Sequence, residues 1–305
     1  MNVPLKHILA PVDMSDPSAR ALRYASAWAL ATGARLSVLL AEEYELPPYL
    51  SPKVQAEVHA IMESERRYAK ERLEAFSLPL VDPAVRPRFY VERGYAADRI
   101  LAAARRLGAD ALVMGTHGRS GLRRLLVGSV TENVARRAPV PVLTVRAVES
   151  EAGVGGRSPW KLRRILVPVD PRFGPVRPAL RLAVGLARDF AASLTVLDCF
   201  EPQAFALVDD EVGRAEERQR FFDRLPRDLR SPPFHLVQRG GDPGELVVRE
   251  ASSLAADLVV VDGAGALDAA AARILRFAPC PVLLVPGPAR RPSRKRPAVR
   301  AGGVS

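Results

Sequence analysis

Short apolar runs alternate along the chain with longer segments in which apolar and polar residues recur at helical spacing. In the first half, the runs predict strands and the segments between them predict helices. Ser15 and Asp16 precede Pro17, which is a typical helix start. The predicted strands are 7–12, 36–40, 88–91, 111–114 and 140–145, and the predicted helices are 17–32, 53–76, 96–107 and 129–137.

This alternation predicts an α/β protein. Strand, helix, strand in succession gives a parallel sheet with right-handed crossovers, so we expect doubly wound, Rossmann-like domains, each with a five-stranded parallel sheet and helices on both faces. Ligands bind such sheets beyond the carboxyl ends of the strands, where the strand order reverses. Two segments qualify, namely Val12-Asp13 after the first strand and Gly115 onward after the fourth.

The whole pattern occurs twice. Residues 6–13 return as 163–170, and further matches follow in the same order: 21–23 with 179–181, 36–39 with 194–197, Arg93-Gly94 with Arg239-Gly240, 109–113 with 256–260, and 139–143 with 279–283. A period this long is far above that of solenoid repeats, so it indicates a duplicated domain. We expect domains at 1–148 and 161–286, a linker at 149–160 and a basic, disordered tail at 287–305.

Composition supports two globular domains. The 305 residues are 48% hydrophobic, 26% charged and 6% aromatic, so the core must be built mainly from Ala, Val and Leu. The net charge of +11 suggests an anionic partner. Six of these charges lie in the acid-free tail, which leaves about +5 for the folded part.

The cysteines and the N-terminus exclude several classes. Cys199 and Cys280 lie in apolar stretches without a CxxC pattern, so they predict neither a disulfide framework nor a zinc site. His7, His59 and His235 are scattered, and we expect no metal site. No apolar leader and no long uncharged run is present, so we expect a cytoplasmic protein without a membrane segment.

Residues 114–130 carry the most chemical information. Gly115, Gly118, Gly121 and Gly128 lie across a predicted strand-to-helix junction, where glycine allows close approach of the backbone to a ligand. A run of exposed amides followed by a helix start favours an anion such as phosphate. The segment is neither a Walker A loop nor a Rossmann GxGxxG motif.

The spacing Gly115-x-x-Gly118, nine residues, then Gly128-Ser129 resembles the nucleotide-binding signature of the universal stress protein family. The opening segment 8–13, Arg93-Gly94 and the closing segment 139–142 resemble that family at matching positions. The resemblance covers nearly all of 4–146 and 162–286.

The resemblance implies a stress-response regulatory protein that binds an adenine nucleotide in its N-terminal domain. The ligand would be ATP, with ADP or AMP as alternatives, and Mg²⁺ would be held mainly by the phosphates. The phosphates would contact Gly118, Gly128, Ser129 and Val130, and the ribose and base would lie near Pro11, Asp13, Ala41 and Gly115. The complete predicted set is Pro11, Val12, Asp13, Ala41, Met114, Gly115, Gly118, Arg119, Gly128, Ser129 and Val130.

Several of these residues have a second interpretation. Asp13 could accept hydrogen bonds from a ribose, or it could help to begin the next helix. Ser129 opens a capping-box pattern that ends at Glu132, so its hydroxyl could cap the helix instead of contacting phosphate. His117 has no paired carboxylate at a readable spacing, which favours a hydrogen-bonding or stacking role over a catalytic base. Arg119 lies nearest the glycines and could screen polyphosphate charge.

The second copy departs from the glycine pattern. Asp262 stands where the first copy has Gly115, and the loop after it is seven residues shorter. Asp170 persists, but we do not expect it to bind a triphosphate alone. We expect a structural or regulatory role, with strands 140–145 and 282–285 pairing so that the second copy replaces a dimer partner. A homodimer is left as an alternative.

Three functions compete. A binding protein with little or no hydrolysis leads, because no group is arranged to activate water; at most we expect a weak ATPase. An adenylating ligase or α-phosphate hydrolase would need a pyrophosphate loop or a His-x-Gly-His signature, and neither is present. A nucleic-acid binder could use the basic tail, but the chain shows no aromatic stacking set, so this role is disfavoured.

Overall fold

The computed structural model describes most of both halves of the chain. The described residues are 5–42, 52–116, 128–146, 162–169, 178–200, 234–263 and 269–287, together with 219, 221, 223, 225–226 and 229. For 52–64 the description is limited to the backbone.

Every strand and helix predicted in the first half is present. The elements are β1 (His7–Val12), α1 (Asp16–Thr32), β2 (Arg35–Glu42), α2 (Pro52–Ser77), the 3-10 turn η1 (Leu78–Leu80), β3 (Arg88–Arg93), α3 (Ala96–Leu107), β4 (Ala111–Gly115), α4 (Ser129–Arg137) and β5 (Val142–Val145). The fifth strand begins at Val142 and not at residue 140. Pro141 can accept a hydrogen bond from Leu112 N–H, but it has no N–H to donate to the ladder.

The second half repeats this order outside 201–233, a segment between two strands of which only a few residues are described. Its elements are β6 (Arg164–Val169), α5 (Pro178–Asp189), β7 (Ser193–Phe200), β8 (Phe234–Gly240), α8 (Pro243–Ser253), β9 (Leu258–Gly263), α9 (Ala269–Phe277) and β10 (Val282–Pro286). One sequence correspondence is wrong by a residue. Gly94 (φ 122°) and Gly241 (φ 143°) both have positive φ and both immediately precede a helix N-cap, so Gly241, not Gly240, is the counterpart of Gly94.

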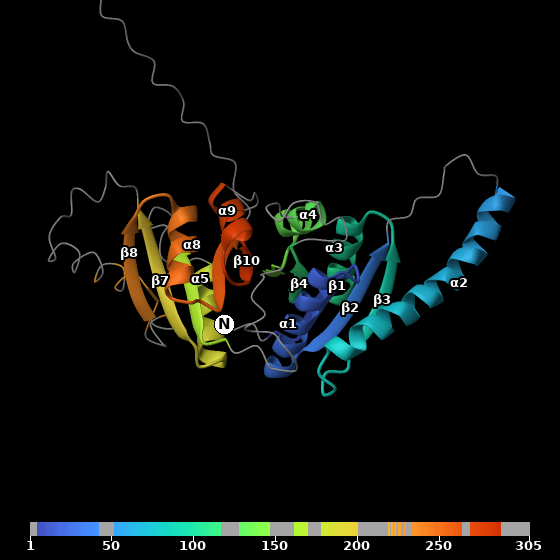
Figure 1. Ribbon diagram of the computed structural model, residues 1–305, viewed down its shortest axis with the longest axis horizontal. Helices are drawn as coiled ribbons and strands as arrows, with labels where there is room; N and C mark the ends of the chain where they lie inside the picture. Colours follow the sequence, from blue (N-terminus) through green and yellow to red (C-terminus); the bar gives the residue numbers. More distant parts are fainter. Residues whose placement is uncertain are drawn as a thin grey trace, which may run out of the picture.

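In the part of the chain that the structure describes, the strands form one sheet of ten, in the order β3-β2-β1-β4-β5-β10-β9-β6-β7-β8 (Figure 1). Each copy contributes five strands there, as predicted, and the strands run parallel within each half. The two halves meet through β5 and β10, which pair antiparallel with Leu143 opposite Leu283. The sheet therefore runs without interruption from one copy into the other.

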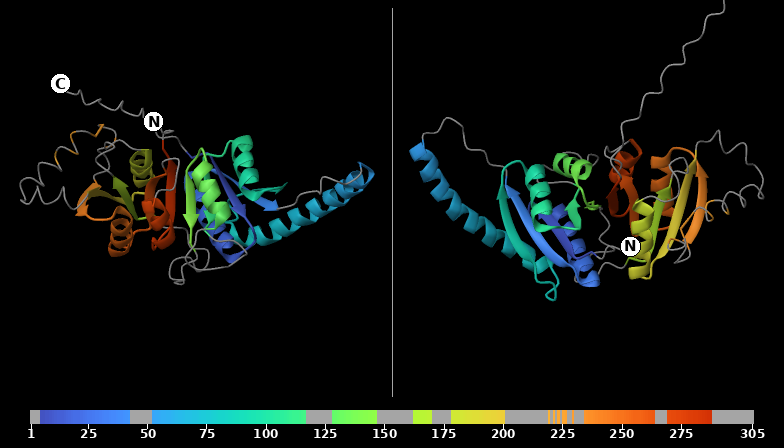
Figure 2. Two further views of the ribbon diagram at one scale, coloured as in Figure 1. Left: turned by 90° about the horizontal axis from the view of Figure 1, so that it is seen from above. Right: turned by 180° about the vertical axis from the view of Figure 1, so that it is seen from behind.

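Helices cover both faces of this sheet, as expected. Successive strand residues point to opposite faces, so Ile8 packs beneath α1 while Leu9 packs beneath α3. One face is covered by α1, α2 and α5, and the other by α3 and α4 in the first half and α8 and α9 in the second. The first turns of α2 extend away from the rest of the protein (Figure 2). None of the described helices combines the length and apolar composition needed to cross a bilayer.

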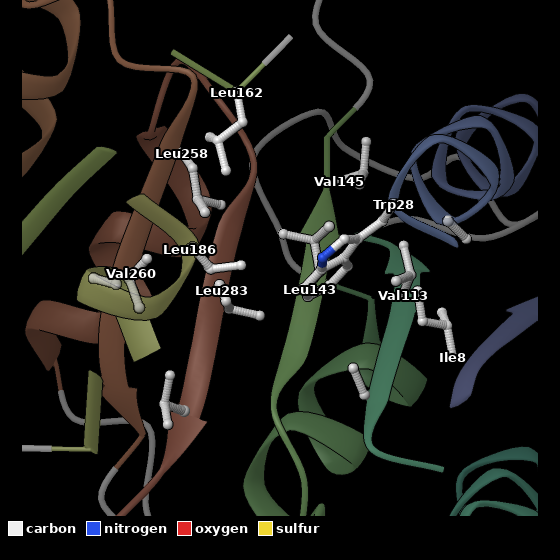
Figure 3. Packing of buried hydrophobic residues seen from close by; sticks show 14 of the residues in the cluster. Ile8, Trp28, Val113, Leu143, Val145, Leu162, Leu186, Leu258, Val260 and Leu283 are labelled. Atoms are coloured by element: carbon white, nitrogen blue, oxygen red, sulfur yellow. The ribbon is translucent and has the colours of Figure 1, made fainter. Parts of the chain in front are cut away.

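The core on the α1 and α5 face continues across the junction between the copies. A single buried cluster joins Trp28 and Leu143 of the first half to Leu186 and Leu283 of the second (Figure 3). Trp28 is among the largest side chains that are fully buried. Because apolar burial is the main favourable term in folding, this shared cluster stabilises both halves together.

Candidate functional site

The strand order reverses between β1 and β4. The chain proceeds from β1 to β2 and β3 on one side, and β4 and β5 lie on the other. The β1–β4 register ends at Leu9, and Pro11, which has no N–H, follows in β1. The carboxyl ends of these two strands carry five of the predicted residues, namely Pro11, Val12, Asp13, Met114 and Gly115.

Ala41 belongs to the same edge of the sheet. Val12 of β1 lies opposite Leu40 of β2, so Ala41 stands one residue further toward the carboxyl end. Ala41 is partly buried, whereas Met114 is only 4% exposed. The structure therefore brings the residues predicted for the ribose and base together on three neighbouring strands.

Gly115 is packed closely against the start of α1, so a side chain here would force the two segments to shift. A Cβ at this position would lie 3.0 Å from both the carbonyl carbon and the carbonyl oxygen of Pro17, in the first turn of α1. These are backbone atoms and cannot rotate away. The absence of a side chain at Gly115 is therefore what allows the start of α1 to reach the end of β4.

The start of α4 corrects the capping-box interpretation. Gly128, in extended conformation, is the N-cap, Ser129 is the first helical residue, and no described side chain caps this helix. The first intrahelical hydrogen bond runs from Glu132 N–H to Gly128 oxygen at 2.9 Å. The N–H groups of Ser129, Val130 and Thr131 precede that bond and face out of the helix start, at the positive end of the helix dipole.

Two threonines that the sequence reasoning missed hold this helix start against β4. Thr116 oxygen accepts the Gly128 N–H at 2.6 Å, and the Thr131 hydroxyl donates to Gly115 oxygen at 2.7 Å. Both threonines are buried. Thr131 lies inside the pattern that was interpreted as a capping box. That pattern specifies only its first and last residues, so the Thr131 hydroxyl had no separate signal in the sequence.

Tyr95 and Asn133 were also missed. The Asn133 amide donates to Ser129 oxygen at 3.0 Å and to the Tyr95 hydroxyl at 3.3 Å. Tyr95 is the N-cap of α3 and is exposed. The two side chains therefore link the starts of α3 and α4, a contact between distant segments that no local pattern indicates.

Of the two roles predicted for Asp13, the structure shows the one at the start of the next helix. Its Oδ1 accepts hydrogen bonds from the Ser15 N–H at 3.1 Å and from the Ser15 hydroxyl at 2.5 Å. Ser15 in turn caps α1 through reciprocal bonds with Ser18. Asp13 thus holds the cap of α1 while standing at the end of β1, and its ligand role stays a prediction.

Some predictions lie outside the described residues. These are Gly118 and Arg119 of the binding set, together with His117, Gly121 and Asp170. Among the residues that the structure does describe, no three His, Cys, Asp or Glu side chains come together as a metal site.

The second half has a different arrangement at the matching strand end. The Oδ1 atom of Asp262, at the end of β9, accepts the N–H of Ala179 in the first turn of α5 at 3.0 Å. A carboxylate therefore stands at the strand end where the first half has Gly115, and it bonds the start of the helix that corresponds to α1. Ala269 opens α9 where Ser129 opens α4. The shortened loop itself, 264–268, lies outside the described residues.

Comparisons with known proteins agree with the duplication. A family model described as the universal stress protein family matches residues 4–146 and, again, residues 161–286. A universal stress protein from Thermus aquaticus is 40% identical over 141 residues, which are 46% of this chain and 98% of that protein. A universal stress protein from Methanocaldococcus jannaschii is 27% identical over 162 residues, covering 49% of this chain and 100% of that protein. Each relative thus matches about half of this chain.

A solved structure matches both halves at once. A universal stress protein from Archaeoglobus fulgidus has a TM-score of 0.60 and covers 92% of this chain and 96% of its own. Its sequence identity is 17%, so the likeness shows the fold.

Proposed function

This chain belongs to the universal stress protein family, and from that premise we propose that it is a regulatory protein that binds one adenine nucleotide, ATP, ADP or AMP, in its N-terminal half. The observation that carries the proposal is the start of α4. Three consecutive amides there face outward without a side-chain cap from the described residues, beside the strand ends where the sheet order reverses.

The phosphates would bind at this helix start. The N–H groups of Ser129 and Val130 offer hydrogen bonds, and the helix dipole favours a negative charge there. Gly118 and Arg119 would complete the contact from the loop. Mg²⁺ would be held mainly by the phosphates and would reduce their mutual repulsion.

The ribose and base would lie along the ends of β1, β2 and β4. Asp13 would accept hydrogen bonds from the ribose hydroxyls, as it already does from Ser15. Pro11, Val12, Ala41, Met114 and Gly115 would pack against the sugar and the base with their apolar surface and backbone.

Hydrolysis would be slow or absent. Phosphoryl transfer to water needs a base or orienting group within hydrogen-bond reach of the attacking water. Asp13, a carboxylate at this strand edge, already holds two hydrogen bonds from Ser15 on its Oδ1 atom. The C-terminal half would bind no nucleotide in this mode, because the carboxylate of Asp262 stands where the first half has Gly115 and would repel the phosphates.

Isothermal titration with ATP tests the proposal. We expect about one ATP bound per chain. In Gly128→Asp the new carboxylate would accept the same amides that the phosphates need, and affinity should fall by at least about tenfold, or ~1.4 kcal/mol. Asp is a preferred N-cap residue, so α4 should stay folded.

The matched control is Ala269→Asp, which places the same charge at the start of α9 in the second half. It should leave ATP binding unchanged. Equal affinity in Gly128→Asp and the unmodified protein would place the site elsewhere. Release of AMP and pyrophosphate on incubation with ATP would instead indicate an adenylating enzyme.

A further inference from the structure

Two side chains of the N-terminal half, Thr144 and Arg146, form hydrogen bonds to the C-terminal half near the β5–β10 pair. The Thr144 hydroxyl donates to Val282 oxygen at 3.0 Å, within the buried junction. The Arg146 guanidinium donates through Nη1 to Ala278 oxygen, also at 3.0 Å. Ala278 directly follows α9, so Arg146 binds at the negative end of that helix dipole.

In a symmetric duplication, the second half would form the same two side-chain hydrogen bonds to the first half. Its sequence has no suitable side chains at the corresponding positions. The strands 142–145 and 282–285 correspond, so Leu284 is the counterpart of Thr144 and Pro286 that of Arg146. Neither side chain has a hydrogen-bond donor. At these two positions the strand pairing is therefore symmetric, but the side-chain hydrogen bonds are formed from the first half alone.

Arg146 is also linked to the candidate site through its neighbour in the chain. Val145, its neighbour, accepts the Thr116 N–H at 3.0 Å, and Thr116 oxygen accepts the Gly128 N–H at 2.6 Å. One covalent link and two backbone hydrogen bonds thus separate Arg146 from the N-cap of α4. Ala135 of α4 also packs against the apolar cluster of the second half.

The partly buried environment of Arg146 strengthens its hydrogen bond to Ala278. Burial lowers the pKa of the Arg146 guanidinium, because part of its hydration is lost at the junction. A partly desolvated cation gains more from a carbonyl at a helix end than an exposed cation does. The end of β5 is therefore fixed by the second half of the chain.

We propose that Arg146 is a positioning residue, through which the C-terminal half holds the Gly128–Val130 amides in the arrangement that binds phosphate. The inference rests on the proposed function of that site. It gives the second half, which has lost the glycine pattern, a defined effect on the first. The route is Ala278, Arg146, Val145, Thr116 and Gly128.

Hydrogen exchange of the full-length, nucleotide-free protein tests the positioning without any ligand. In Arg146→Met, exchange of the peptides that contain Thr116 and Gly128–Glu132 should accelerate by about tenfold, the effect of losing one charge-assisted hydrogen bond. Arg146→Lys keeps a donor and the charge, so its exchange rate should lie between those of the unmodified protein and Arg146→Met. Unchanged exchange in both variants would overturn the proposal.

The matched control is Arg136→Met. Arg136 lies on α4 itself, pairs with Glu132 at 2.7 Å and is 40% exposed, so its removal deletes the same charge without touching the junction. Exchange at Thr116 and Gly128 should stay as in the unmodified protein. Equal acceleration in Arg136→Met and Arg146→Met would count against a specific role for Arg146.

ATP titration of the same variants supplies the binding readout. Arg146→Met should raise Kd by about three- to tenfold, and Arg136→Met should not. Altered exchange with unaltered Kd would overturn the link between Arg146 and binding. If the unmodified protein binds no nucleotide, the proposed function fails, while the exchange measurement still decides whether Arg146 positions the amides.

Discussion

At the scale of single residues, His7 shows how a buried polar group can be fully satisfied. The ring is only 5% exposed, with Nδ1 at 2.9 Å from Leu107 oxygen and Nε2 at 2.8 Å from the Ser37 hydroxyl. Since a carbonyl can only accept, Nδ1 carries the proton and Nε2 accepts from Ser37. The neutral ring thus fits its site.

Folding stability should therefore fall in mild acid. Burial is the main cause that lowers the pKa of His7 from 6.5 in the folded protein. As pH falls through 6.5, the unfolded chain binds the proton first, so the free energy of unfolding decreases until pH is below the folded-state pKa. Urea unfolding at about pH 7.5 and pH 5.5 measures this difference.

The variant His7→Asn should show a smaller loss between these two pH values, because the titrating group is gone. His235→Asn is the control, since His235 is exposed in β8 and its removal should leave the loss as it was. An equal loss in all three proteins would mean that other groups, and not His7, set the acid sensitivity.

At the scale of elements, the contact between α1 and β4 depends on one missing side chain. Gly115 lets the first turn of α1 approach the strand end, and Asp13 and Ser15 then fix the helix start. The same strand end carries the candidate site. The packing of one helix therefore determines where the ligand-facing backbone lies.

Replacement of Gly115 by Ala should separate α1 from β4. The added Cβ would meet Pro17 backbone atoms at 3.0 Å, so we expect a loss of about 1–3 kcal/mol in unfolding free energy and a weaker ATP affinity. Gly263→Ala is the control, because its nearest contact would be 3.5 Å from Val285 oxygen. Denaturant midpoints of the two variants compare the costs, and equal midpoints would refute the packing argument.

At the scale of the whole molecule, the two halves share a sheet and a core. The cluster beneath α1 and α5 includes strand residues from both copies, and β5 and β10 are hydrogen-bonded to each other. Loss of either half would expose the apolar surface of the other. The duplicated chain should therefore behave as one folding unit, unlike two domains joined only by a linker.

Unfolding should occur in a single transition. In Trp160→Phe, Trp28 is the only tryptophan left, and its fluorescence reports the first half, while far-UV circular dichroism reports both halves. We expect coincident urea transitions. Leu283→Ala, in the second half, should shift both transitions together by about 2–5 kcal/mol. A shift in dichroism that leaves Trp28 fluorescence unchanged would show that the halves unfold separately.

Much of this architecture could be predicted because its signals are local. The helices at 96–107 and 129–137 and the strand at 7–12 match the structure at both ends, since helical and strand periodicity lies within each segment. The repeat and the glycine spacing likewise indicated the duplicated fold and the edge of the sheet where the site should lie. The capping box at Ser129 was wrong, because Gly128 ends the preceding loop and takes the N-cap position.

The sequence by itself determined the order of the elements, the duplication and the residues at the strand ends, because these follow from patterns within short segments. Only the tertiary structure decided the partners of Thr131, Asp262 and Arg146. Each bonds a residue between 16 and 132 positions away, so its partner depends on how whole elements pack. The joining of the two sheets is of mixed kind: the repeat indicated which two strands would pair, but the antiparallel Leu143–Leu283 register joins residues 140 positions apart and comes from the structure.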